Sequence, residues 1–101
     1  MTETVLIPPT GSLDSITVFW QNFGIGKGQI TLVCWGSAWT AYFGGMGDDT
    51  IQQFFTQAGS YYLAGKLMSA QWQTHTKTHE KYIVRLCDAV KAHMKQALEA
   101  V

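Results

Sequence analysis

Aromatic and β-branched residues are concentrated in one segment of the chain, from Ser15 to Phe43. This segment holds three of the four tryptophans and three of the five phenylalanines. Residues of these types favour strands, and large rings must be buried or offered to a partner. The segment therefore predicts an aromatic antiparallel sheet, and it limits the fold to classes in which such a sheet has at least one covered face.

Three strands are expected within this segment. Alternating side chains predict a first strand from Ile16, and the glycine-rich GIGKG at residues 24–28 predicts a hairpin turn after it. A second strand carries Ile30, and Gly36-Ser37 is a second tight turn before a third strand from Ala38 to Phe43. Both faces of this sheet carry large side chains. One face is expected to lie against helices, and the other is half-covered by the N-terminal arm or used for contact.

The residues on either side of the segment have different patterns. Residues 1–14 are expected to form an extended arm, because Pro8-Pro9 forbids a helix; Thr2–Ile7 is able to pair at a sheet edge. After the glycines at residues 44–47, a first helix is expected to start at residues 48–50, with two aspartates in its first turn.

Helical periodicity then continues to the end of the chain. The first helix is expected to stop at Gly59, and a short second helix spans Tyr61–Met68. A last helix from about Thr78 to Ala100 has an apolar stripe formed by Ile83, Leu86, Val90, Met94, Ala97 and Val101. The expected fold class is therefore α+β: a three-stranded antiparallel sheet (β-β-β) followed by two or three helices packed on one face. Residues 15–101 form a single domain in this interpretation.

The charge of the chain argues against an electrostatic partner. Seven basic and seven acidic residues give a net charge of zero, and only 14% of residues are charged. No overall field attracts the protein to nucleic acid or to an anionic membrane. The charge is unequally divided, with a net charge of −3 over residues 1–50 and +3 over residues 51–101. Two cysteines, Cys34 and Cys87, are expected to be buried thiols, and no signal peptide or membrane span is expected, so the predicted location is the cytoplasm.

The chain offers little that resembles a catalytic or metal site. His75 and His79 are four residues apart, and His93 projects in a similar direction on a helix, but no third ligand has a metal-typical spacing. The glycine loop at residues 44–47 lacks the lysine of a phosphate-binding loop. We therefore expect no metal, no cofactor and no enzymatic activity.

The candidate interaction surface consists of exposed rings and basic side chains: Phe19, Trp35, Tyr42, Lys81 and Arg85. One hypothesis is contact with another protein, including a second copy of the chain in a homodimer. The alternative is a small nucleic-acid-binding accessory protein that uses the sheet aromatics and the basic face of the last helix. This alternative is the weaker one, since Lys27 is the only basic residue between residues 1 and 65.

Three segments resemble small accessory proteins of lambdoid-type phages and prophages: ITVFWQNFGIGKGQITLVCWGSAWTAYFGGMG, DDTIQQFF and YYLAGKL. They cover roughly residues 15–67, and the terminal EKYIVRLCDAV is compatible with them. The resemblance implies a non-essential phage protein in the cytoplasm of the bacterial host, of a kind that binds host machinery, defence systems included. It transfers no catalytic residues. The expected function is a non-enzymatic protein-interaction module that inhibits or modulates a host complex, with a host or phage protein as partner.

Overall fold

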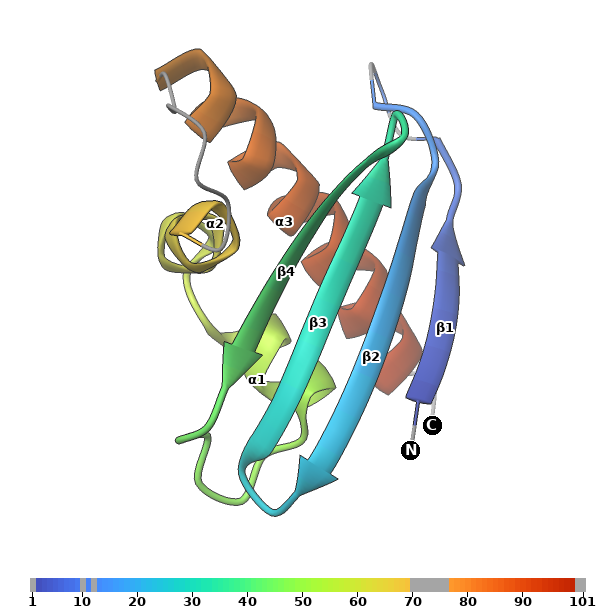
Figure 1. Ribbon diagram of the computed structural model, residues 1–101. Coiled ribbons are helices and arrows are strands. Elements are labelled where there is room, and N and C mark those ends of the chain that lie inside the picture. The colour runs from blue at the N-terminus through green and yellow to red at the C-terminus, as the bar shows by residue number, and fades with distance from the viewer. Residues whose placement is uncertain (1, 10, 12, 70–76, 100–101) are drawn as a thin grey trace.

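The computed structural model describes residues 2–9, 11, 13–69 and 77–99. It confirms an α+β fold, in which a sheet faces the viewer of Figure 1 and the helices lie behind it. In chain order the elements are β1 (Thr2–Ile7), β2 (Ile16–Gly24), β3 (Lys27–Cys34), β4 (Ser37–Phe43), α1 (Ile51–Gln57), α2 (Ser60–Ser69) and α3 (Lys77–Glu99).

The sheet has four antiparallel strands in the order β1-β2-β3-β4, so the expectation of three strands is wrong by one. The additional strand is β1, which pairs with β2 from Thr2 opposite Gln21 to Ile7 opposite Ile16. Pro8 follows directly after β1, where its missing N–H costs the sheet no hydrogen bond. Because β1 extends the sheet sideways, it does not cover the face that the helices leave open (Figure 1).

Two tight hairpins fix the register of β2, β3 and β4. GIGKG forms the first, with Ile25-Gly26 between β2 and β3, as the sequence predicts. Gly26 has a φ of 71°, and a Cβ there would collide with the carbonyl oxygen of Gly47. The carbonyl of Gly26 also accepts a hydrogen bond from the Met46 N–H at 3.0 Å. The turn therefore fixes the position of the glycine loop that leads to α1.

α1 begins with a capping box. The Thr50 hydroxyl accepts a hydrogen bond from the Gln53 N–H at 3.2 Å, and the Gln53 side chain accepts one from the Thr50 N–H at 3.0 Å. Asp48 and Asp49 precede this cap, so the expectation of aspartates in the first turn is wrong. Asp49 also has a glutamine three residues after it, but that side chain, Gln52, is hydrogen-bonded to Asn22 of β2, so the capping box forms between Thr50 and Gln53.

The hydrophobic core lies between the helices and one face of the sheet. Trp20, at the centre of this face, is fully buried and meets Phe55 of α1 edge-to-face, with ring centroids 5.6 Å apart. The predicted stripe of α3 is confirmed for Ile83, Leu86, Val90 and Met94, which are all buried. The Ala97 side chain and Val101 lie outside the described part of the chain. None of the described helices is both long and apolar enough to cross a membrane.

Candidate functional site

The face of the sheet turned away from the helices is the largest exposed feature of the strands. Side chains alternate between the two faces of a strand, and the helices bury the set that contains Val18, Leu32 and Ala41. The alternate set forms what we name the open face: Thr4, Leu6, Thr17, Phe19, Gln21, Phe23, Lys27, Gln29, Thr31, Val33, Ala38, Thr40 and Tyr42. No described element lies over it in Figure 1.

Large apolar side chains are distributed across the whole open face. Leu6 on β1 is 64% exposed, Phe19 on β2 is 39% exposed and Tyr42 on β4 is 55% exposed. Phe23, at the turn end of β2, lies against Tyr42 with ring centroids 6.1 Å apart. Exposed large apolar side chains that lie this close together are typical of a contact surface.

Threonines and small residues fill the space between these large side chains. One cross-strand row runs from Thr4 through Phe19 and Thr31 to Thr40, and the next runs from Leu6 through Thr17 and Val33 to Ala38. The hydroxyls of Thr31 and Thr40 are hydrogen-bonded at 3.0 Å. Thr40 also lies 3.0 Å from the Ile30 carbonyl, to which its hydroxyl can donate. These hydroxyls have partners within the sheet, so a partner can cover this part of the face at little desolvation cost.

The open face carries one charged side chain, Lys27, which alternates with Gln29 and Thr31 and lies at the turn end. β2, β3 and β4 together contain one charged residue, Lys27, which is the first residue of β3 beside the hairpin turn. Glu3 of β1 belongs to the opposite side of the sheet, since it pairs with the buried Trp20. Away from this turn end, an occupant of the open face therefore meets aromatic, aliphatic, hydroxyl and amide groups only.

Trp35 lies at the end of the sheet and not on the open face. It forms the two-residue turn between β3 and β4 with Gly36, and both residues have positive φ, 55° and 75°. Asparagine and glycine are the usual residues at such positions, and a bulky side chain with positive φ is strained. Trp35 is nevertheless 67% exposed. Burial of its ring within the described chain therefore does not explain why a tryptophan occupies this turn.

Lys81 and Arg85 lie one turn apart on α3, in the helical layer. Both are exposed, and they border a hollow of about 670 Å³ that is also lined by Thr78, His79 and Tyr82. The structure thus brings Phe19 and Tyr42 to one face and Lys81 and Arg85 to another layer, with Trp35 at the end of the sheet. The five predicted residues do not form one surface.

Two groups inside the fold have raised pKa values. The pKa of the Cys87 thiol is raised to about 12, mainly by burial and also by the nearby Asp88 carboxylate, against the opposing effect of Lys91. Burial and a hydrogen bond with Cys34 likewise raise the pKa of the Tyr82 hydroxyl. Both groups therefore keep their protons at neutral pH, and a protonated thiol is a poor nucleophile.

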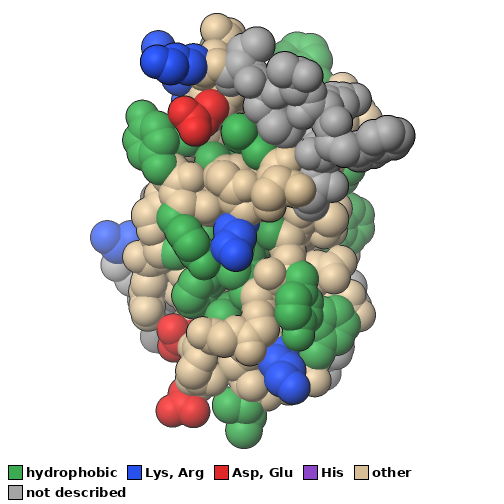
Figure 2. All heavy atoms as spheres, turned by 60° about the vertical axis from the view of Figure 1, so that its left-hand side comes forward, with side chains coloured by type: hydrophobic (Ala, Val, Ile, Leu, Met, Phe, Trp, Pro, Cys, Tyr) green, Lys and Arg blue, Asp and Glu red, His purple; other side chains and the backbone are tan. Residues whose placement is uncertain are grey.

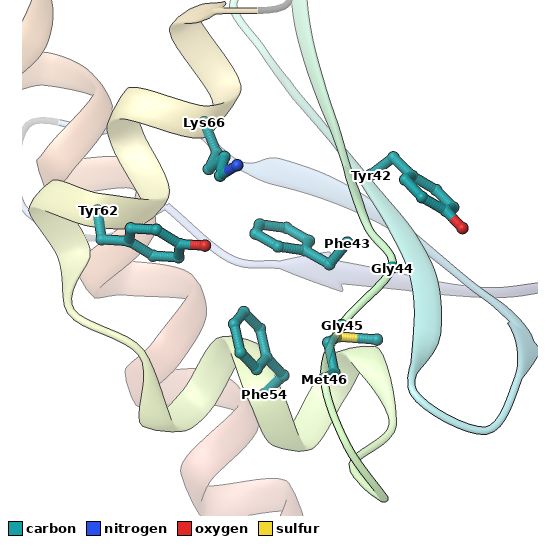
Figure 3. A pocket seen from close by; sticks show the side chains of 8 residues that line it. All are labelled: Tyr42, Phe43, Gly44, Gly45, Met46, Phe54, Tyr62 and Lys66. Atoms are coloured by element: carbon teal, nitrogen blue, oxygen red, sulfur yellow. The ribbon is translucent and has the colours of Figure 1, made fainter.

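A second hollow lies between β4, α1 and α2 and has a volume of about 190 Å³. Figure 3 shows Phe43, Phe54 and Tyr62 turned toward one another there, while Tyr42 points away to the open face. The centroid of the Phe43 ring is 5.1 Å from that of Phe54 and 6.4 Å from that of Tyr62. The Lys66 ammonium lies 5.8 Å from the centroid of the Tyr62 ring.

Figure 2 shows hydrophobic side chains around a basic one in the middle of this side of the molecule. The hollow is smaller than most small-molecule sites, which are ~300–1,000 Å³.

Two of the three histidines are within the described chain. His79 and His93 are half-buried on α3, and His75 lies outside the described residues. Fourteen residues separate His79 and His93 along the helix, which places them about 21 Å apart at a rise of about 1.5 Å per residue. In the part of the chain that the structure describes, no three histidine, cysteine or carboxylate side chains converge as metal ligands do.

A family model described as a phage family, Phage_phiTE_072, matches residues 1–100. The chain belongs to this phage family. The match includes the whole sheet and α1, α2 and α3, so the open face is part of the family's domain. Comparison with curated proteins and comparison with solved structures each find no match.

Sequence reasoning identified Phe19 and Tyr42 but missed Leu6 and Phe23. Leu6 was missed because it lies in the segment assigned to the arm, and its place on the open face follows from its pairing with Thr17. Phe23 alternates correctly with Phe19 and Gln21, so the period of two was the signal that could have found it.

Proposed function

We propose that this phage protein is a non-enzymatic protein-interaction module that acts in the cytoplasm of the bacterial host and modulates a host or phage complex. Its contact surface is the open face of the sheet. The observation that carries the proposal is an uncovered sheet face with Leu6, Phe19, Phe23 and Tyr42 exposed, and with Lys27 at the turn end as its one charged side chain. Surfaces of this kind on small proteins are usually sites of protein contact.

The arrangement supports a protein partner better than a nucleic acid. A base-stacking platform needs positive charge beside its rings to hold the phosphates. Lys81 and Arg85 lie on α3, while Phe19 and Tyr42 point away from the helices. Lys27 is the one basic residue of the open face, and it lies at the turn end. A single nucleic-acid strand would have to pass around the sheet to contact both sets.

Affinity capture from a lysate of the bacterial host tests the proposal. Tagged wild-type protein is compared with Phe19→Lys and with Ile25→Lys, which places the same charge on an exposed turn residue outside the open face. We expect mass spectrometry to identify a protein that the wild type and Ile25→Lys retain and Phe19→Lys loses. Equal recovery by all three variants would contradict the role of the open face. Capture that nuclease abolishes and salt weakens steeply would instead indicate binding through nucleic acid.

A further inference from the structure

We infer that the open face is occupied by a second copy of the chain, in a two-fold dimer whose two sheets pack face to face with the helices on the outside. This inference rests on the proposed function, because it names the partner of the same face. Two packed sheets with helices on both outer sides form a four-layer assembly. Sheets in such face-to-face contacts lie about 10 Å apart with their strands within about 30° of each other.

The chemistry of the open face restricts its occupant. A charged group buried against the middle of this face would find no ion-pair partner there, because Lys27 lies at the turn end, and burying an unpaired charge is strongly unfavourable. The occupant must therefore also present an uncharged surface there, with apolar and hydroxyl groups. Within the described part of the chain, the open face of another copy meets this requirement.

The positions of large and small side chains suit such pairing. A two-fold axis parallel to the strands places β1 of one copy over β4 of the other, and β2 over β3. At the edges of the sheet, Leu6 then faces Ala38 of the second copy, and on the central strands Phe19 faces Thr31 of the second copy. Large side chains oppose small ones at both positions, which is the alternation that allows two sheet faces to interdigitate.

The size of the face indicates a reversible dimer. Four strands about 4.8 Å apart and about six residues long give the face an area on the order of 400 Å² on each copy. That is smaller than the ~800 Å² per partner of a standard interface and close to the lower limit for specific contacts. We therefore expect dissociation on dilution.

Long-range charge does not drive this pairing. The acidic excess of residues 1–50 lies outside the strands, at Asp14, Asp48 and Asp49, while Glu3 of β1 and Lys27 of β3 cancel each other. Face-to-face packing therefore brings together two sheets whose strands have no net charge, and it does not align the −3 half of one copy with the +3 half of the other. Salt screens charge interactions, and few act across this interface, so the dimer should change little as salt is raised.

Sedimentation velocity of the untagged full chain over a concentration series tests the inference. We expect the wild-type mass to move from 11.2 kDa toward twice that value as concentration rises. Leu6→Lys and Phe19→Lys should stay monomeric, and Ile25→Lys should dimerise like the wild type. Circular dichroism melting checks that each variant is folded, and Leu6 is exposed enough that its substitution leaves the core intact. A wild type that stays at 11.2 kDa, or face variants that dimerise normally, would overturn the inference.

Cross-linking tests the direction of the axis. Leu6 and Ala38 lie on opposite edge strands, about 14 Å apart across three strand spacings of one copy. We expect a bifunctional maleimide shorter than this distance to link two copies of the Leu6→Cys, Ala38→Cys double variant. Leu6→Cys alone should not be linked, and linking of this single variant would overturn the proposed axis.

The two proposals fail in different ways. If the wild type is monomeric but Phe19→Lys loses a captured host or phage protein, the proposed function stands and the homodimer is wrong. If the dimer forms as expected but capture is the same for wild type and Phe19→Lys, the homodimer stands and the open face is not the site of host contact.

Discussion

The side-chain carbonyl of Asn22 accepts a hydrogen bond from the backbone N–H of Ile51 at 2.9 Å. This bond joins the end of β2 to the first residue of α1. The Asn22 amide nitrogen also donates to the Gln52 side chain at 3.0 Å. The first N–H groups of a helix have no partner inside the helix, so Asn22 supplies one from the sheet. The contact attaches the helical layer to one side of the sheet.

Replacing Asn22 with alanine should lower the free energy of unfolding by about 1–3 kcal/mol, because the part-buried Ile51 N–H loses its acceptor. Urea denaturation followed by circular dichroism measures the change. Gln57→Ala, at an exposed position of the same helix, is the matched control and should change stability by less than about 0.5 kcal/mol. Equal effects of the two substitutions would show that the Asn22 bond contributes little.

Replacing Leu86 with alanine should lower the free energy of unfolding by about 2–5 kcal/mol. Leu86 is fully buried in the middle of the α3 stripe, so truncation leaves a cavity in the core. Lys95→Ala on the exposed side of α3 is the control, with an expected change below about 0.5 kcal/mol. A loss below about 1 kcal/mol for Leu86→Ala would mean that the core collapses around the missing side chain.

The sequence predicted the layers of the fold better than it predicted the role of each face. Alternation along β2 correctly separates Phe19 from Trp20, and the structure buries Trp20 while leaving Phe19 exposed. Both faces carry large rings, so the pattern alone does not say which face the helices cover. The stripe of α3 was clear because its apolar positions repeat with the helical period while lysines fill the other side.

The missed features depend on contacts between distant segments. β1 was assigned to an arm because Pro8-Pro9 dominated the local pattern, and only its pairing with β2 reveals it as a strand. The Asn22–Ile51 hydrogen bond joins residues 29 positions apart, and no local sequence pattern predicts it. The same is true of the candidate site: Phe19 and Tyr42 lie on one face because they pair with Thr31 and Gln29, which are two residues apart on β3.

Treatment with EDTA should leave the melting temperature unchanged, because a structural metal stabilises the fold that holds it and no such role is expected for His79 or His93. Differential scanning fluorimetry with and without the chelator measures this. The double variant His79→Ala, His93→Ala, treated in the same way, is the comparison. A fall in the melting temperature of the wild type that zinc restores, and that this variant does not show, would assign these histidines a metal.

Stability should fall as the pH rises above about 9. Burial raises the pKa of the Cys87 thiol from its ordinary value of 9.0 to about 12. Between these values the unfolded chain releases the proton while the folded protein retains it, so rising pH favours unfolding by up to about 1.4 kcal/mol per pH unit for this group. The raised pKa of Tyr82 acts in the same direction. The stabilisation is fully present below pH 9 and is lost progressively toward pH 12.

Urea denaturation at a series of pH values from neutral upward measures this dependence. Cys87→Ala removes the titrating thiol and should flatten the decline above pH 9, although it lowers stability at neutral pH through lost packing. Tyr82→Phe should remove a further part of the slope, since it lacks the hydroxyl and keeps the ring that meets Trp39 at a centroid distance of 5.9 Å. If the wild type and Cys87→Ala decline with the same slope, the thiol is not held protonated by burial. A thiol that ionises near its ordinary pKa is a better nucleophile than one that burial keeps protonated.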